Sequence, residues 1–157
     1  MANYKTHSSF NLFLALPIFV VGIYYLLGPS SSYLLTFIGV FAYSTLFMSP
    51  DLDLVHNIKL KSLRGVLSLP FRFYSQVFKH RGISHSFFFG SFTRILWLGG
   101  IAFLLFFLLY QALPSQKNFL LFYNQHKLYL LYGVAGICLA DWCHLLLDIK
   151  FSKILHK

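Results

Sequence analysis

The residues best suited to chemistry in this sequence are histidines and aspartates. Two imidazoles, His80 and His85, stand five residues apart around a glycine in the motif KHRGISHS at residues 79–86. The carboxylates of the chain belong to Asp51, Asp53, Asp141 and Asp148. Mixed imidazole and carboxylate donors suit zinc, manganese or iron, whereas cysteine-rich or all-oxygen sites point to other metals. These residue types therefore favour a metal centre.

The last apolar segment carries three such residues on one face. Asp141, His144 and Asp148 follow an i, i+3, i+7 spacing, which places them within about 60° of one another on a helix. In a spanning helix that ends at Ile149, Asp141 would lie about 12 Å deep. A carboxylate at that depth costs about 2.5–3.5 kcal/mol on insertion scales, so it needs a partner. The candidate partners are a metal ion, an ion pair with Arg94 or a proton relay.

Composition places these residues in a membrane protein. The chain has 157 residues, of which 57% are hydrophobic and 11% are charged, whereas soluble domains carry about 25% charged residues. A single domain of this length cannot hide so much apolar surface in its own core. The net charge of +9 comes from basic residues interrupted by Phe, Leu and Tyr, a pattern typical of topology signals and lipid-headgroup contacts. We expect the lipid bilayer as a partner and no nucleic acid.

We expect an all-α integral membrane protein with four transmembrane helices, which form one membrane-embedded domain over residues 1–157. The expected spans cover residues 8–27, 31–48, 87–110 and 128–149. Pro17 should kink the first span, and residues 111–127 should form an outer loop. The long loop 49–86 should contain a short amphipathic helix that lies in the headgroup region. Its apolar stripe consists of Phe71, Tyr74, Val77 and Phe78.

The distribution of basic residues orients these helices. Ten lysines and arginines fall on one side of the membrane, and two, Lys117 and Lys127, fall on the other, before Arg94 of the third span is counted. Because basic residues are retained on the cytoplasmic side, both termini should be cytoplasmic. This topology returns His7, the loop 49–86 and the end of the fourth span to one face.

We predict a metal site at that cytoplasmic face. Its candidate ligands are His7, Asp51, Asp53, His80, His85, Asp141, His144 and Asp148. This set is too large for one tetrahedral ion, so some members orient the ligands or the site holds more than one ion. A metal-activated water would be the nucleophile, and Arg81 and Arg94 would hold an anionic oxygen such as a phosphate. We assign Asp53 a catalytic role, while base and ligand roles among the aspartates stay open.

Plainer interpretations compete at several of these positions. Asp51 and Asp53 follow Ser49-Pro50, and their role could be merely to cap a short helix. His80 and His85 could be interfacial histidines that bind no metal. The other histidines, expected to be solvated loop or terminal residues, are His56, His126 and His156.

Several motifs resemble a bacterial family of metal-binding membrane proteins. They are Lys5-Thr6-His7, Ser49-Pro50-Asp51-Leu52-Asp53, Lys79 to His85, Gly90 to Arg94 and Ala140 to His144. That family is similar to the YdjM-like membrane-bound metal-dependent hydrolases, which share the Pro-Asp-Leu-Asp and His-Arg-Gly-x-Ser/Thr-His-Ser patterns. The resemblance covers essentially the whole chain. It implies metal-binding positions at His7, Asp51, Asp53, His80, His85 and Asp141, with a looser match at His144 and Asp148.

The sequence thus predicts a membrane-bound, metal-dependent hydrolase in a bacterial cytoplasmic (inner) membrane. The expected cofactor is zinc, with manganese or iron as alternatives. A likeness in ligand order to helical zinc phospholipases and nucleases favours phosphoester substrates, and we expect a membrane-associated phosphoester or lipid. One alternative is a non-catalytic metal-binding protein that serves as a sensor or transport component. Another is a structural membrane protein whose acids only neutralise arginines. The sequence does not indicate the oligomeric state.

Overall fold

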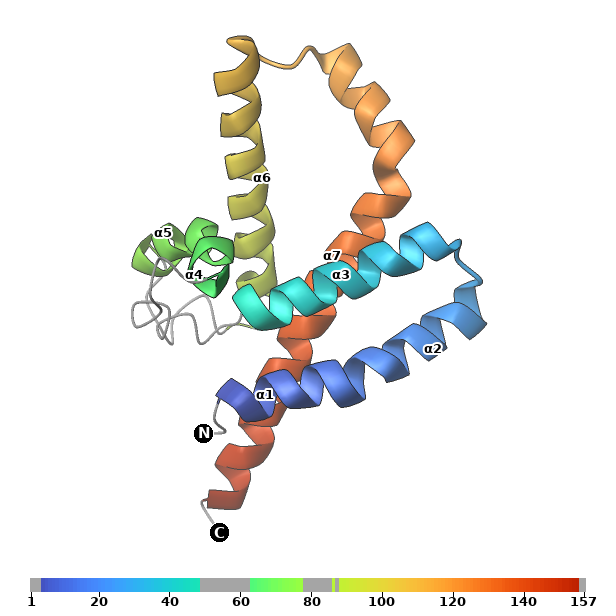
Figure 1. Cartoon of the computed structure of the whole chain (residues 1–157), viewed down its shortest axis with the longest axis vertical. Coiled ribbons are helices and arrows are strands. Elements are labelled where there is room, and N and C mark those ends of the chain that lie inside the picture. Colours follow the sequence, from blue (N-terminus) through green and yellow to red (C-terminus); the bar gives the residue numbers. More distant parts are fainter. Residues whose placement is uncertain (1–3, 49–62, 78–85, 87, 156–157) are drawn as a thin grey trace.

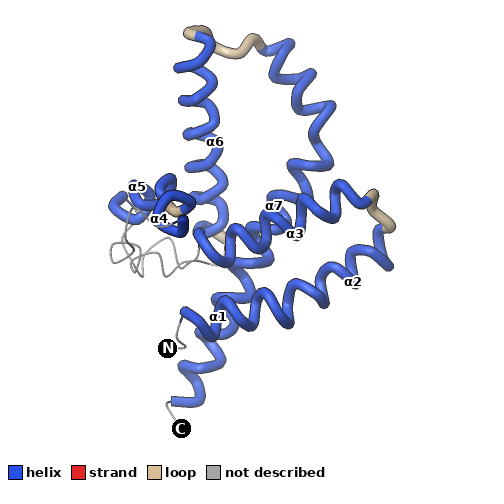
Figure 2. The backbone as a smooth tube through the Cα atoms, viewed as in Figure 1, coloured by secondary structure: helices blue, strands red, loops and turns tan. Residues whose placement is uncertain are grey.

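The computed structural model describes residues 4–48, 63–77, 86 and 88–155, and every regular element among them is a helix (Figure 1 and Figure 2). In chain order these elements are α1 (Tyr4–Phe10), the π-helix η1 (Asn11–Ala15), α2 (Leu16–Leu27), α3 (Ser31–Phe47), α4 (Leu63–Leu67), α5 (Leu69–Val77), α6 (Phe89–Tyr110) and α7 (Gln116–Leu155). The all-α expectation is confirmed for this part of the chain.

Three helical segments of the described chain are long and apolar enough to cross a membrane. They are Lys5–Leu27, Phe89–Tyr110 and Gln116–Asp148, with 23, 22 and 33 residues. Helix α3 is apolar but has 17 residues. Such a helix rises about 25 Å, whereas the hydrocarbon core of a bilayer is about 30 Å thick. Length and composition are therefore consistent with a membrane protein, but the expected fourth span is not confirmed.

Pro17 shapes the first long helix. The elements α1, η1 and α2 follow one another without a break, and η1 ends two residues before Pro17. Proline has no N–H to donate, and its ring clashes with the carbonyl of the residue four positions earlier, here Phe13. A π-helical turn relieves this clash because it widens the backbone at that carbonyl. The disturbance expected at Pro17 thus takes the form of the π-helical turn η1.

Helix α7 is the element against which the N-terminal helices pack. Its residues Ala140 and Cys143 share a buried apolar cluster with Ala15 of η1 and with Phe37 and Phe41 of α3. In Figure 1, the hairpin of α2 and α3 crosses α7 obliquely, and α1 reaches the C-terminal half of α7. This crossing brings the two ends of the described chain to the same region of the molecule.

Gly136 allows a close approach of α3 to α7. A Cβ atom added at Gly136 would lie 3.1 Å from the backbone nitrogen of Phe41 and 3.2 Å from the backbone oxygen of Phe37. Both of these neighbours are backbone atoms of a helix, so they cannot move aside as a flexible side chain could. The absence of a side chain at this position therefore sets the distance between the two helices.

Helix α5 is the short amphipathic helix expected within residues 49–86. Phe71 and Tyr74 are buried, whereas Phe73 and Val77 on the same helix are exposed. Of the expected apolar stripe, Phe71 and Tyr74 thus face the protein, Val77 does not, and Phe78 lies outside the described residues. The placement of α5 in the headgroup region stays a prediction.

Two side-chain hydrogen bonds tie α5 to the next helix, α6. The Trp97 indole N–H donates to the backbone oxygen of Pro70 at 2.7 Å. The hydroxyls of Tyr74 and Thr93 lie 2.8 Å apart and share a hydrogen bond. Since Tyr74 also packs in a buried cluster with Ile137 of α7, α5 connects the described part of the loop 49–86 to both long helices.

Helix α7 begins at Gln116, twelve residues earlier than expected. Ser115 caps its first turn, because the Asn118 backbone N–H donates to Ser115 Oγ at 3.3 Å and the Phe119 N–H donates to the Ser115 carbonyl at 2.9 Å. Serine is a preferred residue at this position. Most of the outer loop expected at residues 111–127 is therefore helical, and the helix also continues beyond the expected end, to Leu155.

The Gly136→Ala substitution should lower the thermal stability of the protein, whereas Gly133→Ala should not. The methyl group at position 136 must displace helix backbone, and overpacking of this kind costs about 1–3 kcal/mol. At Gly133 the nearest atom is Val40 Cγ2 at 3.9 Å, an ordinary contact, so the better helix propensity of alanine should prevail. Thermal unfolding of detergent-purified variants measures both effects. Equal Tm values for the two variants would contradict the close approach of α3 to α7.

Candidate metal centre

Helix α1 crosses the C-terminal half of α7 (Figure 1), and three ionisable side chains of these two helices lie close together. His7 comes from α1, and His144 and Asp148 lie one turn apart on α7. His7 Nε2 is 3.2 Å from Asp148 Oδ1, and His144 Nε2 is 3.6 Å from Asp148 Oδ2. The two imidazole rings stack with their centroids 4.0 Å apart. Two histidines therefore share one carboxylate, with one ring at each oxygen.

The geometry of this cluster fits a divalent metal ion. Potential ligand atoms of His7, His144 and Asp148 all lie within 4.8 Å of one another. Each ring nitrogen faces its own oxygen of Asp148, at 3.2 Å for His7 and 3.6 Å for His144. Two imidazoles and one carboxylate also leave the fourth position open, as in catalytic zinc sites. The cluster could thus hold a metal ion.

Burial makes the charge balance of the cluster important. His7 and His144 are 1% and 3% exposed, and the Asp148 side chain is 17% exposed. An ionised carboxylate with so little water around it needs a cation or strong hydrogen-bond donors. A metal ion bound between the rings and the carboxylate would meet that need, and so would protonation of the imidazoles. The same three residues can therefore exist with or without a metal.

Asn11 holds the two helices in register beside the cluster. Its side-chain amide donates to the Ala140 carbonyl at 3.0 Å and to Thr45 Oγ1 at 3.4 Å. Asn11 follows His7 by four residues, and Ala140 precedes His144 by four, so this contact lies one turn from the cluster on both helices. Asn11 is not among the residues predicted from the sequence. The signal was a polar amide one turn from His7 in an otherwise apolar segment.

Asp141 lies in a polar group between α6 and α7, three residues before His144. Its carboxylate forms a buried ion pair with Arg94, and the Ser91 hydroxyl donates to Asp141 Oδ2 at 2.8 Å. Of the three partners proposed for this deep carboxylate, the structure supplies the ion pair with arginine. Arg94 therefore already has an anionic partner among the described residues.

The described residues bring together a part of the predicted site. The predicted ligands that meet are His7, His144 and Asp148. Asp141 is partnered by Arg94 and Ser91 instead. The predicted site residues that lie outside the described part of the chain are Asp51, Asp53, His80, Arg81 and His85. The roles of these five residues stay predictions.

The Asp141→Asn substitution should lower stability without lowering the metal content. Removal of one partner of a buried ion pair costs about 3–5 kcal/mol, because the other charge stays buried. The double variant Asp141→Leu with Arg94→Met removes both charges, so it should regain much of the lost stability. Thermal unfolding and elemental analysis of the purified variants measure the two quantities. Loss of metal at an unchanged Tm in Asp141→Asn would instead identify Asp141 as a ligand.

Comparison with known proteins agrees with a metal-binding site. No curated protein and no solved structure matches the chain significantly. The profile of one protein family matches residues 2–157, nearly the whole chain. The chain therefore belongs to the family described as uncharacterized metal-binding protein (DUF2227).

Proposed function

We propose that this protein is a membrane-embedded, metal-dependent hydrolase that acts on a membrane-associated phosphoester or lipid. The observation that carries the proposal is the cluster of His7, His144 and Asp148, whose donor atoms could hold a metal ion with one position left open. Membership of a metal-binding family supports the metal. The likeness of the sequence motifs to the YdjM-like hydrolases supports the class of reaction.

The position of the cluster along the candidate spans supports a site at a membrane surface. His7 is the third residue of the segment Lys5–Leu27, and Asp148 is the last residue of Gln116–Asp148. Two spans that meet at these ends would hold their ligands at one face of the bilayer. The basic residues near both ends of the chain and in the loop 49–86 favour the cytoplasmic face of a bacterial inner membrane.

In this proposal the side chains of the cluster have distinct roles. His7 and His144 bind the metal through ring nitrogens, so both must be neutral when the metal binds. Asp148 supplies an oxygen ligand and compensates charge. A divalent ion held there, zinc or else manganese or iron, would act as a Lewis acid and lower the pKa of a bound water. The loop 49–86 would add the remaining predicted residues, which are Asp51, Asp53, His80, Arg81 and His85.

A non-catalytic metal-binding protein is the second candidate, and the burial of the histidines favours it. His7 and His144 are almost fully buried, so a substrate would have to approach the metal from the side of Asp148. A sensor or a transport component needs only to bind the ion and has no such requirement. Metal content alone does not separate the two functions, but turnover does.

The His144→Ala substitution should lower the affinity for zinc by more than about 100-fold, since even partners that only orient a ligand contribute about 10–100-fold. His126→Ala is the matched control, because His126 lies on the same helix and contacts Phe122 and Tyr129. Elemental analysis and zinc titration of detergent-purified protein measure the effect. Zinc binding that is equal in the two variants would remove the proposed site.

Zinc or manganese, added back to the metal-free protein, should restore hydrolysis of phosphoester or phospholipid substrates, and Asp148→Asn should abolish that turnover. The control is again His126→Ala, which should hydrolyse substrate as the wild type does. Release of phosphate or of a lipid headgroup is the measurement. Full metal binding without turnover on any of these substrates would favour the sensor or transport component.

A further inference from the structure

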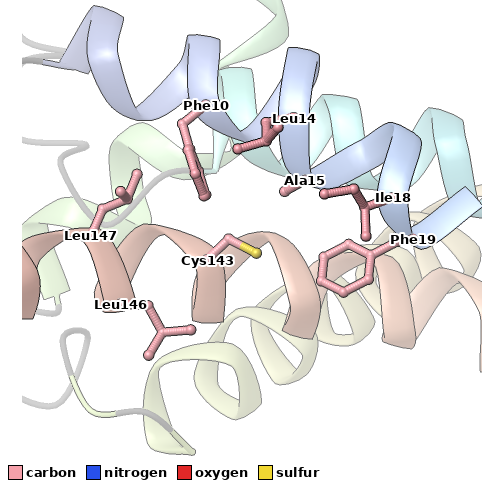
Figure 3. Close-up of a pocket in the computed structure, with 8 residues that line it drawn as sticks. All are labelled: Phe10, Leu14, Ala15, Ile18, Phe19, Cys143, Leu146 and Leu147. Atoms are coloured by element: carbon pink, nitrogen blue, oxygen red, sulfur yellow. The ribbon is translucent and has the colours of Figure 1, made fainter. Parts of the chain in front are cut away.

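An apolar groove opens between the N-terminal helix and α7, next to the metal-binding cluster. Its volume is about 300 Å³, and all eight residues that line it are apolar (Figure 3). One wall comes from residues 10–19, and the other comes from residues 143–147 of α7. Both walls belong to segments long and apolar enough to span a membrane. The groove therefore offers contact to hydrocarbon and no hydrogen bonds from the side chains of its lining.

One end of the groove borders the cluster. Phe10 and Leu147 lie at the same end, whereas Ile18 and Phe19 lie at the other (Figure 3). Phe10 follows His7 by three residues, and Leu147 follows His144 by three. Side chains three residues apart on a helix are neighbours, with Cβ atoms about 5–6 Å apart. A molecule that fills the groove would thus have its near end beside the metal ligands.

The dimensions of the groove suit a single hydrocarbon chain. Phe10 and Ile18 are eight residues apart, so the groove extends about 12 Å at 1.5 Å per residue. A volume of about 300 Å³ over that length gives a mean cross-section of about 25 Å². A helix with side chains is about 10–12 Å wide, so a whole helix cannot enter the groove, whereas one alkyl chain can.

We propose that this groove binds one alkyl chain of an amphiphilic substrate whose anionic head lies at the cluster of His7, His144 and Asp148. The assignment rests on the proposed function, and it narrows the substrate to a phosphoester with a hydrocarbon chain. Lipid tails are as apolar as the groove, so a chain that leaves the bilayer gains little free energy there. The groove instead positions the substrate, because it aligns the chain so that the head reaches the metal.

The test compares the binding of inorganic phosphate with that of ethyl, butyl, hexyl and octyl phosphate to the zinc-loaded full chain in amphipol. From water, each methylene that enters the groove should raise the affinity about fourfold, which corresponds to about 0.8 kcal/mol. The Ile18→Trp and Leu146→Trp substitutions fill the groove from opposite walls, and their side chains are 60% and 56% exposed. In both variants the affinity for alkyl phosphates should increase much less with chain length, and the affinity for inorganic phosphate should stay unchanged.

Leu35→Trp is the matched control, because Leu35 is 66% exposed on α3 and does not line the groove. In this variant the affinity should increase with the length of the alkyl chain as it does in the wild-type protein. Equal dependence in all three tryptophan variants, with phosphate binding intact, would overturn the alkyl-chain site and leave the proposed function standing. A different result would overturn the proposed function instead. In that result only the groove variants abolish the dependence of affinity on chain length, and no phosphate binding depends on zinc.

Discussion

A carboxylate within an apolar helix must have a partner, and α7 carries two carboxylates, Asp141 and Asp148. Asp141 is neutralised by Arg94 of α6, and Asp148 is shared by His144 and by His7 of α1. An unpartnered carboxylate in an apolar medium would cost several kcal/mol. The two acids thus join α7 to two other helices, Asp141 to α6 and Asp148 to α1. The remaining contacts of the fold are compatible with these two.

Apolar packing supports this arrangement but does not determine it. Within a bilayer, apolar helices gain little by leaving lipid for one another, so small residues and polar contacts decide which helices associate. Gly136 supplies the first kind of contact, where the backbone of α3 approaches α7. Asn11 supplies the second kind, through its bonds to Ala140 and Thr45. Gly136 and Ala140 precede His144 by eight and four residues, so both contacts fix α7 on the N-terminal side of the cluster.

The sequence predicted the helices better than it predicted the site. Long apolar runs identified α6 and the N-terminal helix, and the spacing of Asp141, His144 and Asp148 correctly indicated one polar helix face. The spacing did not indicate that Asp141 pairs with Arg94 while Asp148 pairs with His7. These pairings depend on how α1, α6 and α7 cross. The early start of α7 was missed because the polar residues before position 128 outweighed the capping signal of Ser115. Asn11 was missed because its role appears only when Ala140 lies opposite.

The ligands of the cluster come from opposite ends of the chain. His7 and His144 are 137 residues apart, so the ribosome makes the first imidazole long before the second. During synthesis no ion can be captured by this trio, and loading must wait for the final helix to arrive. A bound ion would then close nearly the entire polypeptide into one ring.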